Sequence, residues 1–175
     1  MEITNRILKK ILRNCRRNQA DLVEQAAADA ILLAFPFDEQ QQNIAYRVFA
    51  PVLKSPTVKS CGLIVESGNQ VLANIPPEKL LLLTLPENIL KEPLLDENIS
   101  RQLRRFRFAV ALDLNPELHP YNAAAVLQSS AAKRIGFLTE FSDHFYNIQI
   151  SKKVSDPIES SYRIMLDLVR DTGLL

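Results

Sequence analysis

The sequence of 175 residues has no tryptophan and holds only four glycines, two cysteines and two histidines. Without tryptophan and with few other aromatic residues, a platform that stacks nucleic-acid bases is not expected. The shortage of glycine argues against a loop whose backbone N–H groups cradle phosphate. Two histidines are too few for a histidine-rich metal site, so we predict no metal ion and no cofactor.

The cysteines, the charge and the apolar runs place the chain among ordinary globular proteins. Cys15 and Cys61 lie far apart and form no CxxC pair, which favours a reducing, cytoplasmic compartment. The net charge is +1, so no overall electrostatic field points to nucleic acid as a partner. The densest apolar run, Leu80–Leu83, is far too short to span a bilayer, and the charged N-terminus is unlike a signal peptide.

Residues 4–17 are predicted to form an amphipathic helix within an N-terminal helical element, residues 1–28. One interpretation docks this helix on the core of its own domain with a solvated basic face, and we favour it because such helices are common in cores. The other lays the helix on an anionic membrane, peripheral to its inner face. The predicted apolar stripe consists of Ile7, Leu8, Ile11, Leu12 and Cys15.

Residues 29–175 are predicted to form a single Rossmann-like α/β domain. The expected strands are nearly continuous apolar runs, which is typical of a parallel sheet covered on both faces. We therefore predict three layers with a mainly parallel sheet of five or six strands. Strands are expected at 30–35, 60–66, 79–85, 106–114, 133–137 and 145–151, and helices at 43–55, 96–105, 120–132 and 156–173, the last capped by Asp156 and closed by Gly173.

The loop "FPFDEQQQN" follows the first expected strand, at the end of a parallel strand where binding sites usually lie. It has no glycine, and Asp38 and Glu39 bring negative charge that repels phosphate and stabilises the start of the next helix. Helix capping is the favoured role for these two residues. The alternative is that Asp38 or Glu39 acts as a general base, and Asp38 is the candidate catalytic residue.

A second polar loop, "DLNPELHPYN", follows the fourth expected strand. A carboxylate beside a histidine can transfer protons if the two lie within hydrogen-bond reach. The favoured interpretation is a polar turn with His119 near a helix cap. Asp113, Asn115 and His119 are predicted to form a ligand-binding rim. We treat the third loop, "GFLTEFSDHFYN", as connecting structure because no GxSxG elbow precedes it.

The basic run "RQLRRFRF", residues 101–108, joins Lys133 and Arg134 as a group of cations that could bind an anion. A solvated helix end that meets the start of a strand is the favoured interpretation. We therefore assign no binding role to this basic run.

Three stretches are distinctive: "ADAILLAFPFDEQQQNIAYRVFAPVLKS", "FRFAVALDLNPELHPYNAAAVLQSSAAKRIGF" and "SDPIESSYRIMLDLVRDTG". They resemble, in turn, the opening strand, loop and helix, a later strand, helix and strand, and the helix that closes the first domain in glycosyltransferase family 9, the ADP-heptose:lipopolysaccharide heptosyltransferases. Ala132–Phe137, "AKRIGF", is the closest local match. The resemblance extends over most of residues 29–173. It implies the N-terminal half of a GT-B glycosyltransferase, which mainly receives the acceptor, and a place in the bacterial cell envelope.

The chain departs from the family in its first loop. The family carries a Gly-Asp pair there, whose Asp is the proposed catalytic base, whereas this chain has Glu39-Gln40-Gln41-Gln42 with Asp38 a few residues early. A chain of this length is expected to hold one such half. We therefore expect a pseudoenzyme that binds a partner protein, a second copy of itself, or a sugar or lipid-linked sugar. The alternatives are an active glycosyltransferase component completed by a separate donor-binding chain, and a membrane or scaffold module using residues 4–17.

Overall fold

The computed structural model describes residues 3–19, 29–56, 58–65, 75–83, 95, 97–153 and 155–174. Two short 3-10 turns, Pro77–Lys79 and Ser142–His144, accompany the regular elements. The strands are β1 (Ala30–Ala34), β2 (Lys59–Val65), β3 (Leu80–Leu83), β4 (Phe108–Asp113), β5 (Lys133–Phe137) and β6 (Ile148–Ile150). The helices are α1 (Asn5–Gln19), α2 (Glu39–Lys54), α3 (Glu97–Arg104), α4 (Pro120–Gln128) and α5 (Ile158–Arg170).

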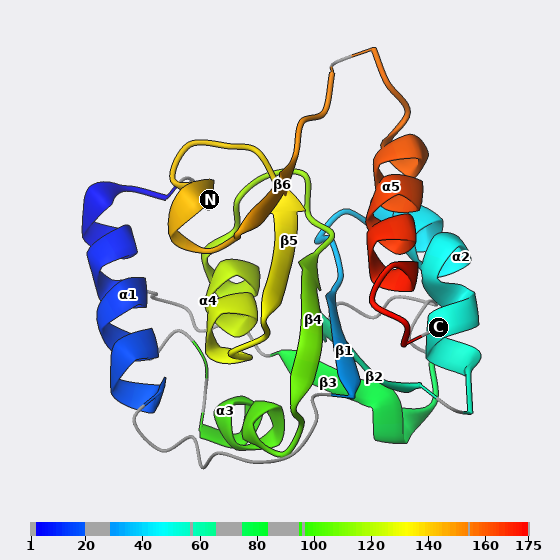
Figure 1. The fold of residues 1–175 in the computed structure, drawn as a ribbon. Coiled ribbons are helices and arrows are strands. Elements are labelled where there is room, and N and C mark those ends of the chain that lie inside the picture. The colour runs from blue at the N-terminus through cyan, green and yellow to red at the C-terminus, as the bar shows by residue number, and fades with distance from the viewer. Residues whose placement is uncertain are drawn as a thin grey trace.

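One sheet holds all six of these strands, in the order β3-β2-β1-β4-β5-β6. Each pair of neighbouring strands is parallel. This order runs outward in both directions from β1, as in doubly wound Rossmann-like domains. The predicted α/β class with a parallel sheet is confirmed (Figure 1).

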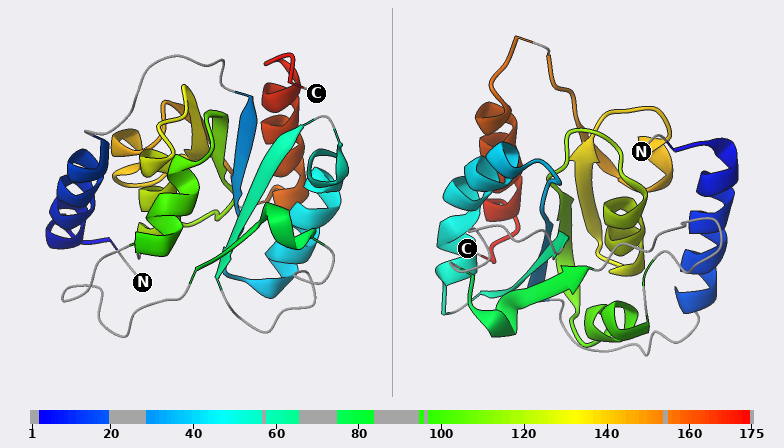
Figure 2. Two further views of the ribbon diagram at one scale, coloured as in Figure 1. Left: turned by 90° about the horizontal axis from the view of Figure 1, so that it is seen from below. Right: turned by 180° about the vertical axis from the view of Figure 1, so that it is seen from behind.

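Helices cover both faces of the sheet and give three layers (Figure 1, Figure 2). α1, α3 and α4 lie on one face, and α2 and α5 lie on the other. Successive side chains of a strand point to opposite faces of the sheet. Leu32 therefore packs on the face covered by α1, α3 and α4, while Ile31 and Leu33 pack on the face covered by α2 and α5. Because both faces are covered, every residue of β1 is buried, which explains its unbroken apolar sequence.

The apolar stripe of α1 docks on α4, as the favoured interpretation predicts. Ile7, Leu8, Ile11 and Cys15 are buried in the cluster that contains the alanines of α4. The Cys15 Sγ atom lies 3.9 Å from the carbonyl oxygen of Ala124. A membrane contact through α1 would therefore use its charged side and not its apolar stripe. Residues 20–28, the rest of the predicted N-terminal helical element, lie outside the described residues.

The ends of two helices differ from prediction. α2 begins at Glu39 and runs through Pro51, so its expected start at residue 43 was four residues late. α5 begins at Ile158 with Pro157 as its N-cap, and no side chain bonds this helix end, so the capping role predicted for Asp156 is wrong. Pro157 fits the helix start because its φ of −57° is already close to the helical value. Gly173 has a φ of 73°, the left-handed conformation predicted for the end of this helix.

Candidate functional site

A cavity of about 410 Å³ lies at the carboxyl ends of β1 and β4, and we call it the switch-point cavity. β1 and β4 are the two central strands from which the strand order runs in opposite directions, the usual place for a ligand in an open parallel sheet. The β1–α2 loop and the β4–α4 loop form its walls. The cavity is lined by Phe37, Asp38, Gln41, Asn115, Pro116, Glu117 and His119.

Buried amide side chains hold the two loops in place. The Gln42 Nε2 atom donates to the carbonyl oxygen of Pro36 at 2.7 Å, and the Asn122 Nδ2 atom donates to that of Phe35 at 2.9 Å. Asn115 joins the loops, because its Oδ1 atom accepts from the N–H group of Phe37 at 3.5 Å. These bonds join the β1–α2 loop to α2, to α4 and to the β4–α4 loop, so the cavity walls are preformed.

Asp113 lies behind the cavity, so its predicted place on the ligand-binding rim is wrong. Its side chain is 1% exposed and is not among the lining residues. The carboxylate accepts hydrogen bonds from the Tyr146 hydroxyl at 2.5 Å, the Asn115 backbone N–H at 2.9 Å and Asn122 Nδ2 at 3.1 Å. Burial raises the pKa of Asp113 to about 6, against the lowering effect of these donors. Asp113 therefore anchors the two loops.

His119 and Phe37 form an aromatic wall of the cavity. Their ring centroids are 3.8 Å apart, and the ring of Tyr121 lies on the other side of His119 at 5.6 Å. Burial lowers the pKa of His119 to about 4, so the ring is neutral at pH 7. Within the described part of the chain, its Nδ1 atom is buried and has no hydrogen-bond partner. The acid–base pair considered for this loop is therefore not formed.

Asp38 caps α2, which is the role favoured for it. Its Oδ1 atom accepts from the backbone N–H of Gln41 at 2.9 Å, and its backbone is extended as an N-cap requires. The carboxylate also lines the switch-point cavity. Glu39 is the first residue of α2 and is exposed.

A neighbouring cavity of about 460 Å³ shares Pro116 and Glu117 with the switch-point cavity. Apart from Leu118 of the β4–α4 loop, its other lining residues come from the chain before α1 and from the loop after β5, which was expected to be connecting structure only. That loop turns sharply at Phe141, whose φ is 67°. The remaining lining residues are Ile3, Leu118, Thr139, Glu140 and Phe141.

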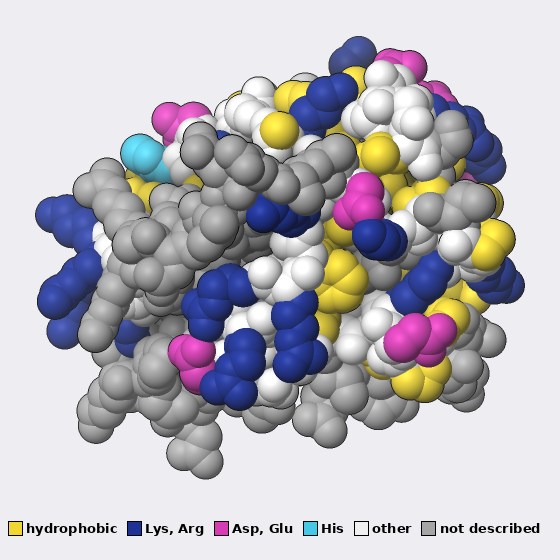
Figure 3. Space-filling model, turned by 60° about the horizontal axis from the view of Figure 1, so that its bottom comes forward, with side chains coloured by type: hydrophobic (Ala, Val, Ile, Leu, Met, Phe, Trp, Pro, Cys, Tyr) yellow, Lys and Arg dark blue, Asp and Glu magenta, His cyan; other side chains and the backbone are white. Residues whose placement is uncertain are grey.

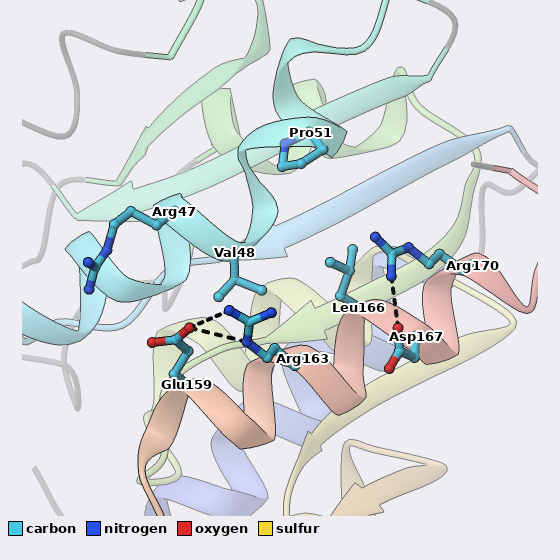
Figure 4. A pocket seen from close by; sticks show the side chains of 8 residues that line it. All are labelled: Arg47, Val48, Pro51, Glu159, Arg163, Leu166, Asp167 and Arg170. Atoms are coloured by element: carbon cyan, nitrogen blue, oxygen red, sulfur yellow. Dashed lines mark hydrogen bonds and ion pairs between the residues drawn. The ribbon is translucent and has the colours of Figure 1, made fainter.

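A third cavity, of about 590 Å³, lies between α2 and α5, away from the strand ends (Figure 4). Its charged side chains largely pair within α5: Arg163 with Glu159 at 2.7 Å, and Arg170 with Asp167 at 3.0 Å. All four are well exposed, and such pairs contribute little to stability or recognition. We therefore place the candidate site at the switch-point cavity.

The chain matches no protein-family model, no curated protein and no solved structure. Within the described ranges, no group of three or more His, Cys, Asp or Glu side chains could hold a metal ion. No helix of the described residues is long and apolar enough to cross a membrane.

Sequence reasoning identified part of this site. Asp38, Asn115 and His119 were predicted and do line the cavity together. Phe37 and Gln41 were missed, although both stand in the loop "FPFDEQQQN". The sequence does hold a signal for Phe37. It is an aromatic residue that stands directly before a helix-capping aspartate, just after a buried strand.

Asp113 and His119 are expected to affect stability in opposite directions between about pH 4 and pH 6. The pKa of Asp113 is raised in the folded state, so its contribution is full at low pH and is lost as the pH rises through about 6. The pKa of His119 is lowered from 6.5 to about 4, so its contribution is lost as the pH falls through this range. The two slopes largely cancel in the native chain.

Single variants separate the two contributions. As the pH rises from 4 to 6, the free energy of unfolding of His119→Gln should fall by about 3 kcal/mol relative to that of the native chain. Over the same range, the free energy of unfolding of Asp113→Asn should rise by a similar amount relative to that of the native chain. Urea unfolding at intervals of half a pH unit measures both slopes. Variant profiles that run parallel to that of the native chain would contradict the assigned pKa directions.

Proposed function

We propose that this chain is a non-catalytic binding domain that takes a sugar-like ligand in the switch-point cavity. The observation that supports this is the contact between the tilted rings of Phe37 and His119, beside the amides and carboxylates of the same cavity. A sugar ring presents C–H groups that pack on an aromatic face and hydroxyl groups that bond amides and carboxylates.

The cavity favours a neutral ligand over a phosphate. Asp38 and Glu117 give its walls negative charge, and no lysine or arginine is among its lining residues. Asp38 also occupies the start of α2, where a phosphate would otherwise meet free N–H groups. A ligand with hydroxyl groups can donate hydrogen bonds to these carboxylates, whereas a phosphate would be repelled.

The same geometry supports binding without catalysis. One carboxylate oxygen of Asp38 accepts the hydrogen bond that caps α2. His119 is a weak base, because burial lowers its pKa to about 4, and no carboxylate orients it in the described structure. Asp113 is enclosed behind the cavity. None of the three is therefore arranged as an activated base.

The resemblance to glycosyltransferase family 9 agrees with this proposal. It assigns the chain to the acceptor-side half of a GT-B enzyme, and the switch-point cavity stands on the matching first loop. The Gly-Asp pair of the family is absent from this loop. We therefore propose a pseudoenzyme that acts on the cytoplasmic side of the cell envelope by binding a sugar-like ligand or, through it, a partner protein.

Titration with neutral mono- and disaccharides, followed by backbone amide chemical shifts, tests the ligand class. We expect shifts confined to residues 36–42 and 114–119, with millimolar or tighter affinity. His119→Ala should weaken binding about tenfold, because it removes half of the aromatic wall. The matched control is His144→Ala, which changes the other histidine, exposed in the turn after β5. Absence of shifts at these residues, or equal loss in both variants, would contradict the proposal.

A transfer assay tests the absence of catalysis. The purified chain is incubated with nucleotide-sugars and lipid or saccharide acceptors, and products are followed by mass spectrometry. We expect no transfer. Sustained turnover by the isolated chain would show that it is an enzyme.

One observation favours the alternative of an active component: Asp38 lines the cavity while it caps α2. In that case a separate donor-binding chain would complete the enzyme, with Asp38 as the base. Asp38→Asn keeps a good N-cap and removes the base, so it separates the two roles. Activity of a reconstituted pair that is lost in Asp38→Asn, without a change in melting temperature, would establish the alternative.

A further inference from the structure

The end of the sheet opposite the switch-point cavity carries a concentration of cations, which we call the basic edge. Here the strands begin, and α3 ends just before β4. Figure 3 shows dark-blue side chains gathered over this end with few magenta ones between them. The basic edge consists of Lys59, Arg101, Arg104, Arg105, Arg107 and Lys133, of which all but Lys133 are well exposed.

Among the described residues, few carboxylates balance these cations. Glu97 pairs with Arg104 at 2.7 Å, and Asp29 pairs with Lys59. Arg101, Arg105 and Lys133 have no ion-pair partner within the described parts of the chain. The whole chain has a net charge of only +1, so these cations are concentrated locally and do not follow from overall composition.

The outward side of α1 adds a second row of cations. Arg6, Lys9 and Arg13 are exposed, and the helix contains no acidic residue. The apolar stripe of α1 is buried on α4, so this side can bind only through charge. Figure 3 shows the dark-blue side chains of α1 and those of the basic edge on one face of the molecule.

We propose that the basic edge and the outward side of α1 form one surface that adsorbs to an anionic membrane. This inference is independent of the ligand in the switch-point cavity. None of the three cavities described above is lined by these cations, so the described residues of this surface offer charge outside those cavities. A bilayer with anionic head groups is recognised by charge density alone.

The composition disfavours a nucleic acid as the occupant of this surface. Single-stranded RNA is normally held by aromatic side chains that stack on its bases, and this chain has no tryptophan and 7% aromatic residues. The membrane contact differs from that of an amphipathic helix, because no apolar side chain enters the lipid. Binding should therefore depend steeply on salt.

Co-sedimentation of the full chain with vesicles tests the proposal. The vesicles contain phosphatidylglycerol and phosphatidylcholine, or phosphatidylcholine alone. Two charge-reversed triple variants are compared with the native chain: Arg101→Glu, Arg105→Glu and Lys133→Glu on the basic edge, and Arg6→Glu, Lys9→Glu and Arg13→Glu on α1. A control triple with the same change in charge reverses Arg47, Lys152 and Lys153, which lie on α2 and after β6. Circular dichroism confirms that each variant is folded.

We expect the native chain and the control triple to bind the anionic vesicles within a few-fold of each other. Each of the other triples should bind about 100-fold more weakly, and binding should disappear in molar salt. No native binding, equal loss in the control, or a loss in only one of the two triples would overturn the proposal. So would tighter binding to a single-stranded RNA than to the anionic vesicles at the same ionic strength.

Discussion

Asp113→Ala is expected to lower the free energy of unfolding by about 4 kcal/mol at pH 7. The carboxylate is buried and accepts three hydrogen bonds, from Tyr146, Asn115 and Asn122. Alanine leaves these three donors without an acceptor in a site that water does not reach. Chemical denaturation with urea at pH 7 measures the change.

A double-mutant cycle shows whether the loss arises from the stranded donors. Tyr146→Phe removes the hydroxyl, so the cost of Asp113→Ala should be smaller by 1 kcal/mol or more in that background, a typical coupling for contacting residues. Asp113→Asn keeps the shape and part of the acceptor capacity and removes a buried charge at pH 7, so it should cost much less than alanine. Additive effects of Asp113→Ala and Tyr146→Phe would contradict this account of Asp113.

Gly136→Ala is expected to destabilise the fold by about 3 kcal/mol. A Cβ atom at Gly136 would lie 2.4 Å from two ring atoms of Tyr146, far inside van der Waals contact. The ring is 4% exposed and its hydroxyl is bonded to Asp113, so it has little freedom to withdraw. The expected result is a lower melting temperature together with altered amide shifts in the β4–α4 loop.

Two controls isolate the contact with Tyr146. Gly62 stands inside β2, where an added Cβ atom would meet its nearest neighbour at 3.4 Å, so Gly62→Ala should change stability by no more than about 1 kcal/mol. In a Tyr146→Ala background the space is open, and Gly136→Ala should then cost little. If Gly136→Ala still lowers stability by about 3 kcal/mol in that background, the strain does not arise from Tyr146 but from another contact of β5.

The parallel sheet could be predicted from the sequence because its strands are buried on both faces. Ala30–Ala34 and Phe108–Asp113 carry that signal in their composition. Element ends were less predictable, because they depend on local conformations. α4 was expected to continue to residue 132, but it ends at Gln128, where Ser129 donates to the carbonyl oxygen of Val126 and Ser130 takes a φ of 53°.

The candidate site could be predicted only in part, for a related reason. Asp38, Asn115 and His119 follow directly from the rule that sites lie beyond strand ends. Whether Asp113 faces ligand or core depends on Tyr146, 33 residues further along the chain. No periodicity connects the two residues, and their meeting requires the loop after β5 to fold back over β4.

The parallel arrangement of the strands also sets a distance. With every strand running the same way, the switch-point cavity and the basic edge lie at opposite ends of β4, which has six residues. At about 3.3 Å per residue the two are roughly 20 Å apart. If the basic edge faces a bilayer, the cavity lies at the end of the sheet that points away from the lipid. A saccharide tethered to lipid would then need a stalk to reach it, whereas a freely diffusing saccharide would meet no barrier.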